Sequence, residues 1–158
     1  MPQILATLTP SPVRRTLGAL VMAALGALLI WMALATAPSL IWRIALLILG
    51  GLALAGMVGL WQATRARIEL TETELRDTAG NRLALIDDIL AIDRGAFAFK
   101  PSNGFVLKLS RPHPRGWAPG LWWRTGQRVG VGGVTGASEG KAMAEALAAR
   151  IAARSPVV

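Results

Sequence analysis

Two long apolar runs, residues 17–37 and 44–60, contain no charged side chain and lie close together near the start of the chain. A break at Pro38 and the single charge of Arg43 separate them. Because a helix rises ~1.5 Å per residue, 20 helical residues reach about 30 Å, the thickness of a bilayer's hydrocarbon core. The pattern predicts a helical hairpin over residues 17–61 that crosses a membrane and returns.

The hairpin divides the 158-residue chain into three parts. Residues 1–16 form a short N-terminal segment, residues 17–61 the hairpin, and residues 62–158 one modest soluble domain. The net charge of +8 is compatible with contact to anionic lipid or to nucleic acid, and the anchor favours lipid. Cysteine is absent from the sequence, which excludes disulfides, thiolate catalysis and cysteine metal sites.

Arginines flank the hairpin on one side. Arg14 and Arg15 precede the first span, Arg65 and Arg67 follow the second, and the connecting turn carries only Arg43. Positive residues stay on the cytoplasmic side of a membrane, so we expect both termini in the cytoplasm.

A cleaved signal peptide is the alternative interpretation of the first span. The pair Arg14 and Arg15, an apolar run and the small residues of 33–37 have the order of its parts. The apolar run is nevertheless longer than the ~7–15 residues of a signal core, and a second span follows at once. We therefore favour an uncleaved anchor.

Small residues recur at every fourth position in both runs. They are Ala19, Ala23 and Ala27 in the first run, and Gly51, Ala55 and Gly59 in the second, and Gly26, Gly50 and Gly56 can help the two runs pack. Helices in lipid associate through close backbone approach, so these two ridges are the predicted packing seam, although alanine and glycine are common throughout the chain. Trp42 and Trp61 fit interfacial anchors. Neither span has an ionisable residue at its centre, which argues against a transport pathway.

After Trp61 the apolar pattern changes to the alternation of β-strands. The expected strands are 68–71, 74–77, 83–86, 89–92, 96–99, 105–109, 121–124 and 128–131. The sequence also predicts a loop over 111–120, a hairpin turn over 125–127 and an amphipathic helix over about 138–153. The expected fold class is a membrane α-helical hairpin plus an α+β soluble domain.

This order of elements resembles that of small bacterial membrane proteins with an N-terminal two-helix hairpin and a cytoplasmic PH-like domain. The segment from Ile68 to Leu75 is similar to the opening "strand, Thr-Glu, strand" of those domains, and the segment from Leu85 to Ile89 is similar to their "apolar, acidic pair, Ile" strand start. The resemblance implies an antiparallel sheet or barrel of about six or seven strands with a C-terminal helix. It also implies a location in the bacterial inner membrane.

Three further patterns have structural interpretations. The glycine-rich residues 129–136 match neither phosphate-binding fingerprint. Asp87 and Asp88, as neighbours on a strand, point to opposite faces and cannot share a metal ion. His113 has no cysteine or second histidine to complete a zinc site. We therefore expect no cofactor, no metal and no enzymatic activity.

The best functional candidate is a segment rich in arginine and tryptophan between residues 111 and 124. Its members are Arg111, Arg115, Trp117, Trp122, Trp123 and Arg124. Indole and guanidinium groups suit the lipid headgroup layer, and the same mixture suits a protein interface. The structural alternative is that the sheet core takes one of Trp122 and Trp123 and leaves the other exposed. The aromatic residues are not spread along a basic strand, so we expect no nucleic acid partner.

These expectations favour a membrane-anchored, non-enzymatic accessory or interaction protein. Its soluble domain would contact an integral-membrane partner or a second copy at the bilayer surface. The alternative is an anionic-lipid-binding module that uses Arg111, Arg115, Trp117 and Arg124.

Overall fold

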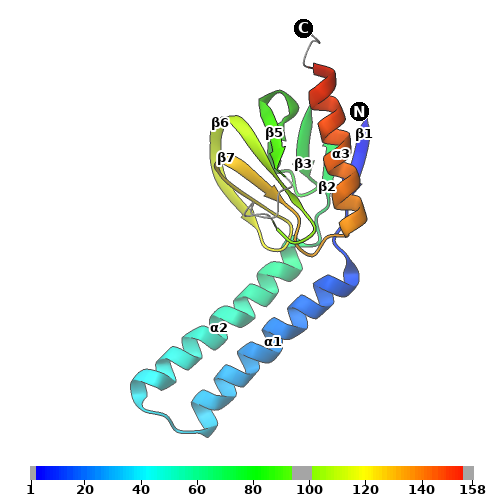
Figure 1. Cartoon of the computed structure of the whole chain (residues 1–158). Helices are drawn as coiled ribbons and strands as arrows, with labels where there is room; N and C mark the ends of the chain where they lie inside the picture. Colours follow the sequence, from blue (N-terminus) through cyan, green and yellow to red (C-terminus); the bar gives the residue numbers. More distant parts are fainter. Residues whose placement is uncertain (1–2, 94–100, 155–158) are drawn as a thin grey trace.

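The computed structural model describes residues 3–93 and 101–154 of the chain. The elements in chain order are β1 (Ile4–Leu8), α1 (Pro12–Ala35), α2 (Leu40–Ala63), β2 (Ile68–Thr71), β3 (Glu74–Asp77), β4 (Arg82–Leu85), the short 3-10 helix η1 (Ile86–Asp88), β5 (Ile89–Asp93), β6 (Phe105–Ala118), β7 (Trp122–Val131) and α3 (Ala137–Arg154). Figure 1 shows α1 and α2 side by side as a hairpin that projects from one end of a β-sheet domain, with α3 lying along that domain. The layout confirms the expected α+β class.

Helices α1 and α2 each have 24 residues, so each is about 36 Å long. Only 17% of the apolar stretch of α1 and 11% of that of α2 are buried. A core helix of a soluble protein would be mostly buried, whereas these helices expose leucine, isoleucine and valine along their length. The chain thus has two helices that are long and apolar enough to span a membrane.

The seam between the two helices agrees only in part with the predicted one. Ala19, Gly26 and Ala33 are buried on α1, and Gly50 is buried on α2. A Cβ added to Gly50 would lie 3.0 Å from the carbonyl oxygen of Gly26 and 2.8 Å from a side-chain carbon of Ile30. The helix backbones therefore meet at this pair of glycines.

Of the predicted seam residues, Ala19 is buried, and Ala23 and Gly59 are half-buried. Ala27, Gly51 and Ala55 are exposed, and a Cβ added to Gly51 would meet nothing within 4 Å. The predicted seam is wrong at these three positions, because the buried glycine of α2 is one residue earlier and turns the ridge of Gly51 and Ala55 outward.

The domain contains two antiparallel sheets, one with the order β1-β2-β3-β4 and one with the order β5-β6-β7. Strand β1 lies before the hairpin in sequence but pairs with β2, which follows it; Leu8 is opposite Ile68. The sequence places residues 1–16 outside the soluble domain, whereas the structure places Ile4–Leu8 in its first sheet. The two ends of the hairpin are therefore held in one sheet.

Strands β6 and β7 are longer than the sequence predicts. Most of the expected loop 111–120 belongs to β6, and β7 runs through residues 125–127 and pairs with β6, so the predicted turn there is wrong. The ring of Trp123 lies against Gly130, seven residues later in the same strand. A straight strand would separate these residues by about 23 Å, so β7 bends sharply, and Gly126 within it has a φ of +57°. The expected strand 96–99 lies outside the described residues.

The core lies between the two sheets and α3. Its largest fully buried side chains come from six strands, from the β6–β7 turn and from α3: they are Phe105, Leu8, Ile68, Leu70, Leu75, Leu83, Ile89, Leu107, Leu109, Leu121, Met143 and Leu147. The structure confirms the predicted C-terminal helix to within one residue at each end. Its apolar stripe is directed as expected, since Met143 and Leu147 are fully buried and Ile151 packs against the same core.

Candidate functional site

Arg15 connects the two helices at the base of the hairpin. The guanidinium of Arg15, in the first turn of α1, lies 4.0 Å from the ring centre of Trp61 in α2. It also donates a hydrogen bond of 3.1 Å to the carbonyl oxygen of Trp61. A cation over an indole face contributes about 0.5–1 kcal/mol at an exposed site. Trp61 therefore has a partner within the protein, whereas Trp42, near the opposite end of α2, is exposed.

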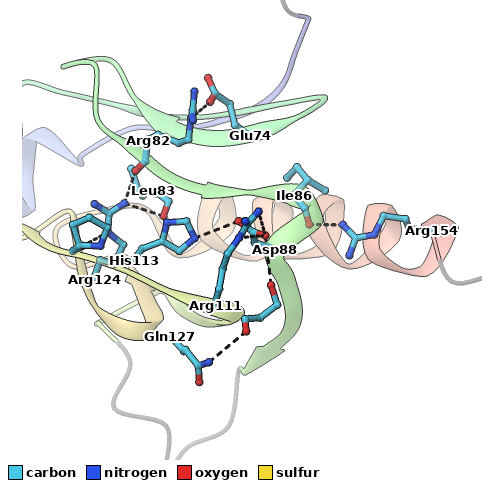
Figure 2. Close-up of polar contacts among 12 residues, drawn as sticks. Glu74, Arg82, Leu83, Ile86, Asp88, Arg111, His113, Arg124, Gln127 and Arg154 are labelled. Carbon is cyan, nitrogen blue, oxygen red and sulfur yellow. Dashed lines mark hydrogen bonds and ion pairs between the residues drawn. The ribbon is translucent and has the colours of Figure 1, made fainter.

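The side chain of Arg111 is committed to a buried carboxylate. Asp88, which is only 4% exposed, accepts a hydrogen bond of 2.8 Å from Nε of Arg111 and one of 3.4 Å from the hydroxyl of Ser110 (Figure 2). Nε2 of His113 lies 3.3 Å from the second carboxylate oxygen. The hydrogen bond from Arg111 holds the pKa of Asp88 below its ordinary value of 3.8, against burial, which raises it. The same bond raises the pKa of Arg111. This cluster fastens η1 to β6.

Arg124 is likewise occupied within the protein. Its Nε donates 2.6 Å to the carbonyl oxygen of Pro114, and its Nη1 donates 2.5 Å to the carbonyl oxygen of Arg82 and 3.3 Å to that of Leu83 (Figure 2). Strand β4 belongs to the first sheet and β7 to the second, so Arg124 ties the two sheets together. An arginine with three carbonyl partners is not free to bind a lipid phosphate.

The two adjacent tryptophans have different surroundings. Trp122 is buried, and its indole N–H donates 3.0 Å to Oδ2 of Asp77, whose carboxylate also accepts bonds of 2.8 and 2.9 Å from Asn81. This confirms that the core takes one of the pair. Trp123 is half-buried rather than exposed, because its ring packs on Gly130.

Only Arg115 and Trp117 of the predicted set have exposed side chains without such internal ties. Trp117 is 74% exposed and lies near the end of β6, beside the last turns of α2. A Cβ added to Gly59 of α2 would lie 3.8 Å from Pro119, which follows β6. The end of β6 that carries Trp117 is thus next to the base of the hairpin.

A groove of about 590 Å³, here called the hairpin-base groove, opens between this end of β6, the end of α2 and the β3–β4 turn. Its lining includes Trp117 and five polar residues that sequence reasoning did not assign to a site: Gln62, Arg65, Asp77, Thr78 and Asn81. The available signal was the position of Gln62 and Arg65 directly after the second apolar run. Asn81 comes from a turn cluster whose proximity to α2 only the fold determines.

The remaining sequence patterns have structural roles. Asp87 pairs with Arg154 at 3.1 Å on the surface while Asp88 points inward, so the two carboxylates do not share a site. Gly132 and Gly133 leave no room for a Cβ, because the backbones of Gly104 and Gly120 lie against them. Within residues 3–93 and 101–154, no group of three or more histidine, cysteine, aspartate or glutamate side chains could hold a metal ion.

The fold and the site describe a protein in which a two-helix apolar hairpin is joined at both ends to an antiparallel α+β domain. No family model, curated protein or solved structure matches the chain.

Proposed function

We propose that this protein is a membrane-anchored, non-enzymatic accessory protein of the bacterial inner membrane. Its PH-like cytoplasmic domain contacts an integral-membrane partner, or a second copy of itself, at the bilayer surface. The observation that carries the proposal is the pairing of β1 with β2, which joins the domain to both ends of the apolar hairpin.

The connection at the base of the hairpin is short and has several bonds. The backbone N–H of Ser11 donates 2.8 Å to the carbonyl oxygen of Val134, and that of Thr9 donates 2.7 Å to a carboxylate oxygen of Glu139 in α3. A domain fastened in this way cannot swing away from the helices on a flexible linker. It presents one fixed surface next to the bilayer, which suits contact with another membrane protein.

The same pairing supports the proposed topology. Strands β1 and β2 flank the hairpin in sequence, so both must lie on one side of any membrane that the two helices cross. The flanking arginines favour the cytoplasmic side. Cleavage after residue 37 would remove β1 and the fully buried Leu8 with it, which favours the uncleaved anchor.

The lipid-facing side of α2 offers a contact for another helix. Gly51 and Ala55 form an outward ridge of small residues on which a second backbone can approach closely. Because the chain contains no cysteine, a single introduced cysteine labels one position.

The test places a photoreactive cross-linker on Gly51→Cys in native membranes, with Leu20→Cys, an exposed position on α1, as the control. We expect one adduct of defined mass from position 51 and none from position 20. An adduct of twice the chain's mass identifies a second copy, and a different mass identifies another protein. Absence of any adduct from position 51 contradicts the proposal.

Anionic-lipid binding is the second candidate function. A specific observation supports it for two of the four residues that the sequence suggests. Arg111 and Arg124 are bound internally, which leaves Arg115 and Trp117 exposed beside the hairpin base. An indole at this level fits the headgroup layer.

A further inference from the structure

We propose that the hairpin-base groove is a binding site for a single phospholipid of the cytoplasmic leaflet, with the lipid phosphate held by Arg65. This inference rests on the membrane placement proposed above. It goes beyond lipid contact by the exposed residues Arg115 and Trp117, because it assigns the lipid to a defined groove and its phosphate to a different cation.

The groove is lined by apolar and polar residues together. Gly59, Gln62 and Ala63, in the last turns of α2, line it together with Pro119. Arg65 lies just beyond the helix, and Thr78 and Asn81 belong to the β3–β4 turn. A volume of about 590 Å³ lies within the usual range of about 300–1,000 Å³ for small-molecule sites. This combination suits a phospholipid, whose acyl chains can lie along the apolar residues of α2 while its phosphate lies at the level of Arg65.

Arg65 is the basic residue of the groove lining, and the fold leaves it available. Arg15, Arg111 and Arg124 are all engaged by partners within the protein. For Arg65, by contrast, the part of the chain that the structure describes provides no hydrogen bond or ion pair to the guanidinium. A guanidinium forms strong, charge-assisted hydrogen bonds with phosphate oxygens.

Asp77, the acidic residue of the lining, does not compete for that guanidinium. Its two carboxylate oxygens accept hydrogen bonds from the indole N–H of Trp122 and from the backbone and side-chain amides of Asn81. The residue is only 2% exposed. The negative charge is thus satisfied inside the domain, and the accessible charge of the groove is that of Arg65.

The location of the groove favours a lipid over a soluble anion. The groove lies at the end of the exposed apolar helix α2, whose residues Gly59, Gln62 and Ala63 form part of its lining. Trp117, which is 74% exposed, forms another part of the wall. A soluble anion would have no use for apolar lining beside a membrane-facing helix, whereas a lipid uses both the apolar lining and the cation.

The experiment counts the phospholipids that the full-length protein retains. The protein is extracted in a mild detergent, exposed to phosphatidylglycerol or to phosphatidylcholine, and measured by native mass spectrometry. We expect one tightly retained phospholipid. Arg65→Gln should reduce its retention about tenfold, as loss of a charge-assisted hydrogen bond implies. Gly59→Leu, which adds a bulky side chain to the lining of the groove, should reduce retention without removing the charge.

Arg67→Gln is the matched control, because Arg67 is exposed, carries the same charge two residues away and does not line the groove. Equal losses for Arg65→Gln and Arg67→Gln would overturn the site, as would the absence of a retained lipid on the unmodified protein. Displacement of the lipid by millimolar inorganic phosphate would also overturn it, in favour of a soluble anion. Alkaline carbonate extraction tests membrane insertion separately, so a failure of the proposed anchoring is distinguished from a failure of this site.

Discussion

Replacing Leu8 by alanine tests whether the strand before the hairpin belongs to the sheet domain. The Leu8 side chain is fully buried and packs in the core that both sheets and α3 share. Leucine-to-alanine changes in such positions cost about 2–5 kcal/mol, the sum of the lost transfer energy and the cavity left behind. Since small domains are stable by only about 5–15 kcal/mol, we expect Leu8→Ala to remove a large share, near 3 kcal/mol.

Leu5→Ala is the matched control on the same strand. Leu5 is 36% exposed, so the same chemical change should cost less than about 1 kcal/mol. The measurement is amide hydrogen exchange of β2 in the full-length protein in lipid nanodiscs. A loss of about 3 kcal/mol accelerates exchange through global opening by about a hundredfold.

Unchanged exchange of the β2 amides in Leu8→Ala would refute the placement of β1 in the cooperative sheet. Equal acceleration by Leu5→Ala and Leu8→Ala would refute the burial argument instead. The isolated fragment 62–158 lacks strand β1 of its first sheet. It is therefore unsuitable for testing what the domain binds.

The other predictions concern close contacts and charge. Gly50→Ala should weaken the hairpin and lower its resistance to denaturation by SDS, whereas Gly51→Ala should not, because only the first Cβ meets the opposite helix. Asp88→Asn should lower the urea midpoint near neutral pH. The difference from the unmodified protein should disappear as the pH falls through the lowered pKa of Asp88, below 3.8, because protonation then removes the same carboxylate charge. Gly130→Ala places a Cβ in the ring of Trp123, so acrylamide quenching should gain one accessible tryptophan.

The elements that the sequence predicts well have local signals. Both membrane-length helices follow from run length, and α3 follows from a stripe at helical spacing. Strand β1 has no comparable signal, because its five residues do not alternate in polarity and its partner is 60 residues away. Pairing over that distance depends on the hairpin that brings the two strands together. The polarity pattern of a single strand carries no information about such a partner.

The bent ribbon of β6 and β7 escaped prediction for a different reason. Pro112 and Pro114 argue for a loop because proline cannot donate to a sheet. The structure accommodates them where the register of β6 shifts against β7, on either side of His113, so the missing donors fall in an irregular stretch. A shift of this kind leaves no mark in the composition of the segment.

The sequence does not predict which residues of the arginine- and tryptophan-rich segment are available at the surface. The sequence groups Arg111, Arg115 and Arg124 by proximity, whereas the fold separates them by partner. Asp88 and the carbonyl oxygen of Arg82 come from other elements, and they occupy two of the three guanidinium groups. Arg65, the basic residue of the hairpin-base groove, lies outside the predicted segment altogether.

The hairpin and the sheet depend on each other energetically. Closing an unstructured loop of about 60 residues to pair β1 with β2 would cost about 4 kcal/mol of chain entropy. Two antiparallel helices of equal length return the chain to its starting level. Once the hairpin has formed, this chain entropy is already lost before the strands pair. Loosening the contact of Gly26 with Gly50 should therefore reduce the protection of β1, although these glycines lie in the middle of the apolar helices. The hairpin is in this sense part of the domain's folding unit, and the surface of the domain at the base of the hairpin is fixed by the same contacts that hold the helices together.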